Sequence, residues 1–466
     1  MIGRIAEQAT LRRAADSNES EFVAVYGRRR IGKTYLVRET FEGEFTFVHS
    51  GLARTKMKGQ LHAFRNSLKA FGHTKCPAVT NWLDAFEELK KLIELSAQPK
   101  KIVFIDEMPW MDTPKSSFVP ALENFWNGWA SARKDVLLIV CGSATSWIIN
   151  KVIRSKGGLH NRVTEQISLA PFTLRECEQY AVSRGLQLTQ MQLAELYMVL
   201  GGVPYYWHFV QPTQSVAQAI DYLFFAENAK LRCEFEDLYA SLFKTDAPYV
   251  KIVTALGGSE QGLTREELIK KSGVQANGRF TKYLEELEQC GFIRKYHAID
   301  KNVNEAIYQL IDSFSLFHLQ FAAANRQQER AFWQNNLGTG LYNNWRGHAF
   351  ERICLCHIEN LKRALQIGGV SSTECAYHGN GVQIDLVINR RDGIANLCEM
   401  KCTDDEYVID AAEYDRLVAR RQALQKVLGE KCSVHPIMVS ANGLKANKYS
   451  TIMMQVVKLG DLFGYG

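Results

Sequence analysis

The chain has 466 residues, of which 46% are hydrophobic and 23% are charged, and its formal net charge is +6. This length exceeds what one hydrophobic core supports and predicts three or four domains. The composition is that of a globular protein. Neither a signal peptide nor an apolar run long enough to cross a membrane is visible, so we expect neither secretion nor a membrane partner. Eleven irregularly spaced cysteines indicate reduced thiols and a cytoplasmic location.

The first motif lies in EFVAVYGRRRIGKTYLVRETF, residues 21–41, which begins as an apolar strand, turns at GRRRIGKT and continues with helical spacing. The turn matches the complete pattern GxxxxGK[ST]. Its glycines let backbone N–H groups surround a phosphate, its lysine reaches the β- and γ-phosphates, and its threonine holds Mg²⁺. We therefore predict an ATP site with these contact residues: Gly27, Arg28, Arg29, Arg30, Ile31, Gly32, Lys33, Thr34 and Tyr35.

Two further apolar runs supply acidic and small polar residues. KKIVFIDEMPW, residues 100–110, predicts a buried parallel strand that ends in Asp106 and Glu107. Asp106 would bind Mg²⁺ through water, and Glu107 would be the general base for the attacking water. The run VLLIVCGSATSW predicts another buried strand, after which Ser143 is placed to sense the γ-phosphate or the water. A serine in an ordinary turn fits that position equally well.

These motifs resemble the STAND-like branch of AAA+ P-loop ATPases, typified by the archaeal-type ATPases, over about residues 1–320. IGRIAEQATL, at the N-terminus, is similar to the leading sequence motif of that family. By this resemblance, Gly3 and Arg4 would lie near the nucleotide base. The resemblance implies an ATP-hydrolysing enzyme that requires Mg²⁺ and could form a nucleotide-dependent homo-oligomer.

Two later segments carry the same resemblance. GGLHNRVTEQISLAPFTLRE is similar to the segment that places an arginine, here Arg162, near the γ-phosphate. GGVPYYW is similar to a motif of the helical lid, in which Pro204 would lie beside the adenine. Arg162 could instead be a surface arginine, and Pro204 could be a simple helix breaker.

Residues 248–312 show three helical segments and then two strands, with a capping box from Thr264 to Glu267. This order predicts a winged helix-turn-helix. The net positive charge permits a nucleic-acid partner, and four basic residues could contact DNA phosphates: Arg279, Lys282, Arg294 and Lys295. Three glutamates on the third helix favour the alternative, a switch module that contacts only its own chain.

From about residue 335 the pattern predicts a new unit, with one long helix over 346–361, three strands, a second helix from about 408 to 429 and a final strand. The hairpin IDLVINRRDGIANLCEMKC contains Asp385, Glu399 and Lys401 within apolar runs, where unpaired charges are costly. We expect Glu399 and Lys401 to share one strand face because they are two residues apart. The sequence CLCH, 354–357, is not favoured as a zinc site because a helix would splay its side chains.

The order of elements and the spacing D-x₁₃-ExK resemble the PD-(D/E)xK nuclease fold. That resemblance implies a Mg²⁺ site formed by Asp385 and Glu399, with Mn²⁺ as a possible substitute. The Met400 carbonyl could be a further ligand, and Glu351 would complete the shell. Lys401 would orient and help to deprotonate the attacking water. The alternative is a structural Glu399–Lys401 pair in a module that does not cut.

The predicted fold class is α/β, with a P-loop AAA+-like parallel sheet followed by three further units. The predicted domains are the ATPase core (1–171), a helical lid (172–245), a winged helix (246–325) and a nuclease-like domain (335–466). Two functions fit this order. One is an ATPase coupled to a nuclease-like domain that acts on DNA, in a defence or mobile-element context. The other is an ATP-driven signalling or assembly switch whose last domain binds a partner without cleavage.

Overall fold

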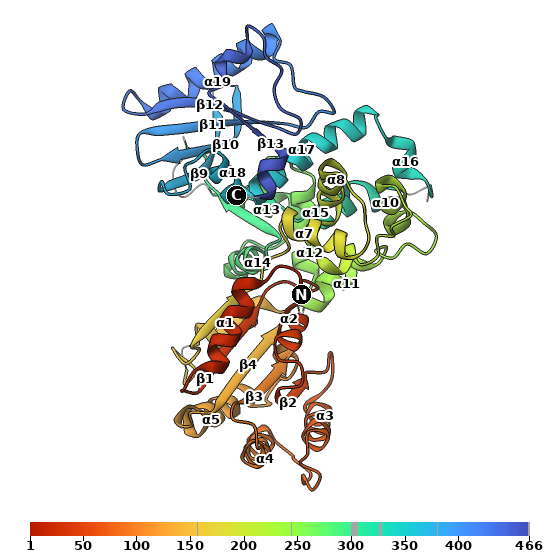
Figure 1. Ribbon diagram of the computed structural model, residues 1–466, viewed down its shortest axis with the longest axis vertical. Helices are drawn as coiled ribbons and strands as arrows, with labels where there is room; N and C mark the ends of the chain where they lie inside the picture. The colour runs from red at the N-terminus through yellow and green to blue at the C-terminus, as the bar shows by residue number, and fades with distance from the viewer. Residues whose placement is uncertain (156, 244, 300–305, 326–328, 380, 465–466) are drawn as a thin grey trace. The chain divides into compact units, whose positions relative to one another are not determined.

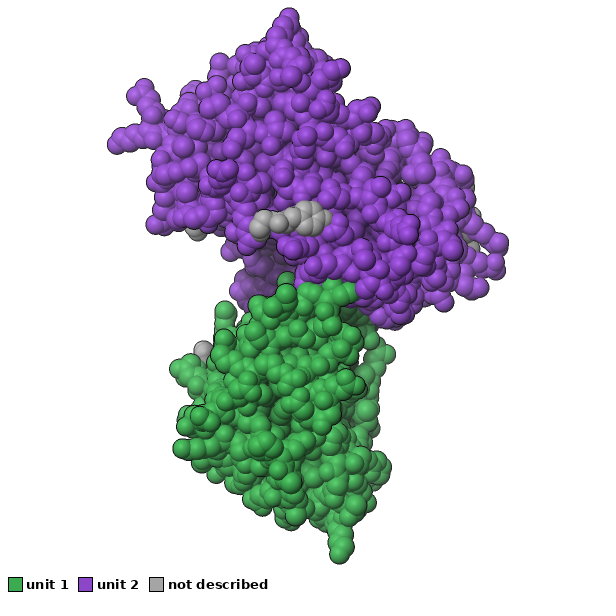
Figure 2. All heavy atoms as spheres, in the orientation of Figure 1, with its two compact units in different colours: residues 1–170 green, residues 171–466 purple. Residues whose placement is uncertain are grey.

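A computed structural model describes residues 1–155, 157–243, 245–299, 306–325, 329–379 and 381–464. The chain divides into two compact units, Met1–Ala170 and Pro171–Gly466, which are coloured separately in Figure 2. This division coincides with the predicted end of the ATPase core, and the three other predicted domains lie together in the second unit. Within the described residues, no helix is both long and apolar enough to cross a membrane.

The first unit is built on a five-stranded parallel sheet in the order β2-β3-β4-β1-β5. The strands are β1 (Glu21–Tyr26), β2 (Phe45–Ser50), β3 (Lys101–Asp106), β4 (Val136–Gly142) and β5 (Glu165–Ser168). Every residue of β4 is buried, as expected for a central parallel strand covered on both faces. The predicted α/β class is therefore confirmed for this unit, and the carboxyl ends of β1, β3 and β4 meet at one edge of the sheet.

Helices cover both faces of this sheet (Figure 1). They are α1 (Ile5–Asp16), α2 (Lys33–Thr40), α3 (Met57–Ala70), α4 (Trp82–Leu95), α5 (Phe118–Gly128) and α6 (Thr145–Ile148), with short turns η1 (Met108–Trp110), η2 (Ala130–Ala132) and η3 (Ile149–Ile153). Val23 and Val25 of β1 pack with residues of α1 and α2, while Phe22 and Ala24 pack with residues of α3, α4 and α5. The alternation of side chains along β1 thus gives a three-layer arrangement.

The second unit begins with helices, as predicted for residues 172–245. They are α7 (Leu174–Ser183), α8 (Gln190–Leu200), α9 (Pro204–Trp207), α10 (Val216–Phe224) and α11 (Glu234–Leu242). Three of them, α7, α8 and α10, start with capping boxes, in which a threonine or serine and a glutamate or glutamine exchange hydrogen bonds with each other's backbone. These helices share one apolar core with later parts of the second unit, while smaller apolar clusters of the same unit lie outside it.

Three helices and a small antiparallel sheet follow. They are α12 (Ala247–Gly257), β6 (Leu263–Thr264), α13 (Arg265–Ser272), α14 (Gly278–Gln289), β7 (Ile293–Tyr296) and β8 (Ile307–Leu310), with sheet order β6-β8-β7. The predicted capping box from Thr264 to Glu267 is present. The short strand β6 was not predicted, because two residues give no usable alternation pattern. The connecting helices are α15 (Ser313–Phe317), η4 (His318–Ala322) and α16 (Phe332–Asn336).

The C-terminal sheet has five strands in the order β13-β12-β11-β10-β9. Its elements are α17 (Gly340–Cys356), α18 (Ile358–Ala364), β9 (Ser372–Gly379), β10 (Val382–Arg390), β11 (Ile394–Lys401), α19 (Ala411–Leu428), β12 (Ser433–Ser440), η5 (Ser450–Ile452), β13 (Gln455–Lys458) and η6 (Leu459–Phe463). The predicted single helix at 346–361 is wrong in one respect, since it is two helices that meet at His357.

Helices pack on both faces of the C-terminal sheet. Leu386 and Cys398 share an apolar cluster with residues of α17, whereas Val387 and Leu397 share another cluster with Leu424 of α19. We call these surfaces the α17 face and the α19 face. Charged side chains of the β10–β11 hairpin can contact one another only if they lie on the same face of the sheet.

Candidate functional site

The loop between β1 and α2 has the backbone geometry that its glycines allow. Gly27 has φ +143, and a Cβ there would lie 2.3 Å from the Leu169 carbonyl oxygen. Gly32 has φ +91 and directly precedes α2, and a Cβ there would meet no atom within 4 Å. The loop therefore needs glycine at the first position for space and at both positions for conformation.

Two side chains at the start of α2 point to a phosphate and metal site. The Lys33 ammonium is buried and donates to the carbonyl oxygens of Gly27 (2.9 Å) and Arg28 (2.8 Å). The Thr34 hydroxyl, on the first turn of α2, donates to the Asp106 carboxylate at the end of β3, at a distance of 2.7 Å. The residues predicted to bind phosphate and Mg²⁺ thus lie together, although Thr34 and Asp106 are 72 positions apart in the chain.

Glu107 and Ser143 form the other side of this edge. The Ser143 hydroxyl donates to Glu107 Oε1 at 2.6 Å, and the Ser143 backbone N–H lies 3.3 Å from Oε2. The Lys33 ammonium lies 3.3 Å from the same serine hydroxyl. Ser143 therefore connects the loop lysine to the glutamate, and its sensing role stays a prediction.

Two glycines at neighbouring strand ends escaped the sequence reasoning. A Cβ on Gly51 would lie 2.5 Å from the Glu107 carbonyl oxygen, and one on Gly142 would lie 2.6 Å from the Pro109 ring. Glu107 itself has a positive φ of 46. The tight turn after β3 thus depends on small neighbours. The signal in the sequence was only a glycine after each strand, which is too common to single out.

The donor set fits an ATP–Mg²⁺ complex. A threonine hydroxyl and an aspartate carboxylate are hard oxygen ligands of the kind that Mg²⁺ prefers, and they already lie in mutual contact. The N-terminus of α2, where Gly32 provides no side-chain cap, directs backbone N–H groups and positive dipole toward a phosphate. Thr34 and Asp106 would hold the metal ion, which when bound neutralises charge on the phosphates.

The remaining residues that were predicted to contact the nucleotide lie in four places: before α1, in the loop before α2, before β5 and at the start of α9. Gly3 and Arg4 both have positive φ just before α1, and Arg4 donates to the Ala170 carbonyl oxygen at 2.7 Å. Arg28 and Ile31 are buried, Arg29 and Arg30 are half-buried and Tyr35 is exposed. Arg162 is exposed in the turn before β5. Pro204 begins α9 in the second unit, and its role beside an adenine stays a prediction.

A polar pocket of about 250 Å³ lies in the second unit between the β6-β8-β7 sheet and the α17 face. It is lined by Glu351, Arg352 and Asp385, together with Arg294 and His348. Burial raises the pKa of Glu351, and the Asp385 charge adds to this rise. Burial also lowers the pKa of the Arg352 guanidinium to about 10. Two of the predicted metal-site carboxylates thus share one pocket.

His348 bridges two carboxylates at the pocket. Its Nδ1 lies 3.3 Å from Glu351 and its Nε2 lies 2.8 Å from Glu260. The contact with Glu351 raises the pKa of His348 although burial opposes the rise. The imidazolium form therefore fits this position, and the pocket carries cations and anions in close to equal number.

Glu399 and Lys401 lie away from this pocket, in a group of charges on the α19 face. The two residues form a 2.7 Å ion pair, as their spacing predicted. Arg420 of α19 donates to the other Glu399 oxygen at 2.7 Å. Lys401 also lies 3.6 Å from Glu413, which accepts a bond from Arg416. We call these five residues the Glu399 network.

The structure does not bring Glu351, Asp385, Glu399 and Lys401 together at one metal site. Among the described residues, only one group of three or more potential ligands has its ligand atoms within 4.8 Å, and it includes none of these four. The cause is an irregularity in β10: Ile384 pairs with Tyr377 and Val387 with Cys375, so one extra residue lies between them. Asp385 consequently faces α17, while Glu399 faces α19.

The basic residues considered for DNA contact also separate. Arg279 and Lys282 on α14 and Lys295 on β7 are exposed. Arg294 lies in the polar pocket, where it donates to Gln309 at 2.7 Å and its guanidinium lies over the Tyr296 ring. Three of the four side chains therefore remain available to a phosphate backbone.

Comparison with known proteins agrees with the nucleotide site. Residues 2–208 match the family model described as an ATPase domain predominantly from Archaea. An uncharacterised protein of Methanocaldococcus jannaschii is 24% identical over 86% of this chain and 88% of its own length. Similar solved structures are a Walker-type ATPase of Pyrococcus abyssi and the ORC2 protein of Aeropyrum pernix. The match to the first is 16% identical, covers 69% of this chain and 96% of the Pyrococcus chain, and has a TM-score of 0.49. The match to the second is 13% identical, covers 68% of this chain and 91% of the Aeropyrum chain, and has a TM-score of 0.42. Residues 2–208, which are less than half of the chain, are thus similar to an ATPase domain that is found predominantly in Archaea.

Proposed function

We propose that this protein hydrolyses ATP at the edge of the first sheet, with Glu107 as the general base. The observation that carries the proposal is the pair of contacts that meet there, Thr34 with Asp106 and Ser143 with Glu107. Lys33 would exchange its bonds to loop carbonyls for bonds to the β- and γ-phosphates. Glu107, oriented by Ser143, would accept a proton from the water that attacks the γ-phosphorus.

A lysine substitution tests the binding half of this proposal. Lys33→Ala should abolish ATP binding, because it removes the buried ammonium at the centre of the loop. Binding of a fluorescent ATP analogue to the full chain is the measurement. Lys251→Ala, on α12 in the second unit, is the matched control and should bind as the wild type does. Undiminished binding by Lys33→Ala would overturn the assignment of the loop.

We further propose that the C-terminal domain binds a partner and does not cut nucleic acid, so that the ATPase acts as a switch. The Glu399 network supports this proposal, because both Glu399 oxygens already accept bonds from cations of the same chain. A carboxylate held in this way must lose at least one of these bonds to become a metal ligand. The opposing nuclease proposal rests on Glu351 and Asp385, which share a pocket.

Metal-dependent cleavage separates the two proposals. The full-length protein is incubated with supercoiled plasmid and Mg²⁺ or Mn²⁺, with and without ATP, beside Asp385→Asn and Lys401→Met variants. The switch proposal expects no cleavage by any of them above an EDTA control. Cleavage by the wild type that both substitutions remove would contradict it and support a nuclease.

A further inference from the structure

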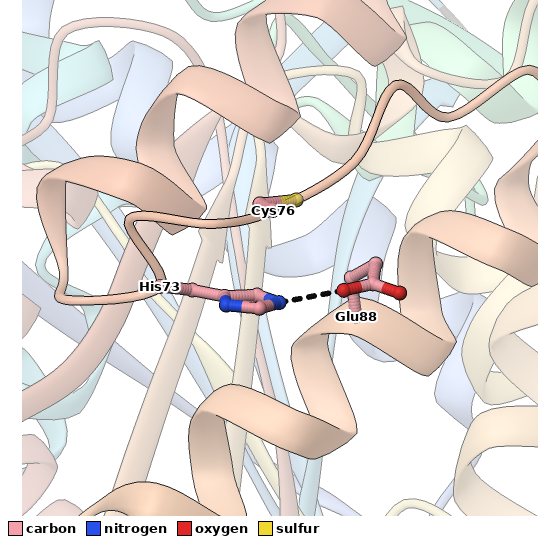
Figure 3. A group of neighbouring side chains, drawn as sticks. All are labelled: His73, Cys76 and Glu88. Carbon is pink, nitrogen blue, oxygen red and sulfur yellow. Dashed lines mark hydrogen bonds and ion pairs between the residues drawn. The ribbon is translucent and has the colours of Figure 1, made fainter.

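A mixed cluster of His73, Cys76 and Glu88 lies in the first unit (Figure 3). His73 and Cys76 come from the connection between α3 and α4, and Glu88 comes from the middle of α4. Their ligand atoms all lie within 4.8 Å of one another, and no other group of three potential ligands among the described residues meets this distance. Neither ATP hydrolysis nor partner binding uses these residues.

The local backbone positions the two loop ligands. The Cys76 N–H donates to the His73 carbonyl oxygen at 3.0 Å and closes a turn over the sequence HTKC. Arg65 of α3 donates to the Cys76 carbonyl oxygen at 3.1 Å and holds that turn against the helix. The His73 N–H donates to the Leu68 carbonyl oxygen at 3.0 Å. The backbone that carries His73 and Cys76 is thus held in place by bonds within the chain.

The two carboxylate oxygens of Glu88 have different partners. Its Oε2 lies 2.6 Å from His73 Nε2, and its Oε1 accepts a bond from Lys91 at 2.7 Å. The carboxylate is therefore oriented, with Lys91 fixing one oxygen while the other faces the histidine and cysteine.

We propose that His73 Nε2, Cys76 Sγ and Glu88 Oε2 bind one Zn²⁺ ion, with water as the fourth ligand. Zinc accepts imidazole, thiolate and carboxylate at about 2.0–2.3 Å, which requires ligand atoms about 3.3–3.8 Å apart in a tetrahedron. The three atoms lie within 4.8 Å now, and the 2.6 Å contact of His73 with Glu88 opens by roughly 1 Å.

Binding carries a defined proton balance. The thiol of Cys76 is buried. Coordination breaks the S–H bond of Cys76 and forms the Zn–S bond, and the thiol proton goes to water. The proton that His73 Nε2 shares with Glu88 also leaves that nitrogen, to water from an imidazolium or to Nδ1 in a neutral ring, before Nε2 binds zinc. The ion would link the HTKC turn to α4 and so brace the α3–α4 connection.

An ion pair between His73 and Glu88 explains two of the three residues without a metal. It does not explain why a cysteine lies within ligand distance of both, in the same turn as His73. Zinc binding and a simple ion pair differ in one respect, because only zinc binding requires the Cys76 sulfur. Substitution of Cys76 therefore distinguishes the two.

The full-length protein, free of an affinity tag that binds metal, is stripped with EDTA, given equimolar Zn²⁺ and desalted. Zinc per chain is measured by mass spectrometry, and Co²⁺ is titrated into a second stripped sample. The variants are Cys76→Ser and His73→Gln, and Cys233→Ser, an exposed cysteine, is the matched control. ATP-analogue binding by each variant reports whether the first unit is folded.

The proposal expects about one Zn²⁺ per chain in the wild type and in Cys233→Ser, and a near-ultraviolet sulfur-to-cobalt charge-transfer band in both. Loss of a direct ligand should weaken binding by more than about 100-fold in Cys76→Ser and in His73→Gln. A wild type without this band, or a folded Cys76→Ser variant that keeps zinc, would overturn the proposal. Should either variant fail to fold, the wild-type cobalt spectrum still decides between sulfur ligation and the simple ion pair.

Discussion

Replacing Glu399 with glutamine removes the central negative charge of the Glu399 network. Glu399 is buried and accepts bonds from Lys401 and Arg420, so the variant leaves two cations facing a neutral amide. Removal of one partner from a fully buried ion pair costs about 3–5 kcal/mol. The side chains of Lys401 and Arg420 are 30% and 24% exposed, and solvent therefore compensates part of the loss. We expect a destabilisation of about 2 kcal/mol.

Native-state hydrogen exchange measures this loss at the strands concerned. A local destabilisation of about 2 kcal/mol accelerates exchange roughly thirtyfold, and we expect that change in the amides of β11 and β12. Glu227→Gln is the matched control, because its partner Arg330 and Glu227 itself are 72% and 70% exposed. It should change stability by less than about 0.5 kcal/mol.

The direction of the result is diagnostic. If Glu399→Gln exchanges as slowly as the wild type, or more slowly, the network does not stabilise the sheet. The charges on β11 would then need a functional explanation, and the nuclease proposal would regain its main support.

Three further predictions concern separate parts of the chain. Ser143→Ala should lower the ATP turnover rate about tenfold with nucleotide affinity unchanged, because it frees the Glu107 carboxylate, and a wild-type steady-state rate would contradict the sensing role. If α14 contacts DNA, Arg279 and Lys282 changed together to glutamate should weaken binding on every sequence and flatten its salt dependence, whereas an unchanged slope in a fluorescence anisotropy titration would assign α14 to contacts within the chain. Burial would raise the pKa of Glu413, but the bond from Arg416 and the Lys401 charge hold it below the ordinary value of 4.5, so its contribution is present above that pH and is lost as the pH falls toward the folded-state pKa. Thermal unfolding between pH 6 and 3 should therefore show a steeper acid loss in the wild type than in Glu413→Gln, and parallel curves would contradict the pairing.

The nucleotide site could be predicted from the sequence because its motifs encode local backbone shape. A glycine-rich turn between a strand and a helix leaves few conformations, and a buried strand that ends in two acids has one sensible place for them. Parallel strands then bring Thr34 and Asp106 to the same edge without any further information. The contact of Ser143 with Glu107 follows from the same geometry.

The C-terminal site could not be predicted in the same way. Alternation placed Ile384, Leu386 and Ile388 on one face, but Ile384 packs on the α19 face and the other two pack on the α17 face. One extra residue in β10 reverses the alternation, and nothing in the letters IDLVI marks it. The zinc-ligand cluster was equally hidden, because Glu88 lies 12 residues beyond Cys76 and no standard spacing joins them.

Single-turnover hydrolysis by Glu107→Gln tests the central claim most directly. The variant keeps the Lys33, Thr34 and Asp106 contacts and retains an amide that can still accept the Ser143 bond, so it should bind ATP like the wild type. An amide cannot accept the proton of the attacking water, and the hydrolysis rate should fall by about 10²–10⁴-fold. A variant that binds ATP and hydrolyses it at the wild-type rate would contradict the assignment of Glu107 as the base.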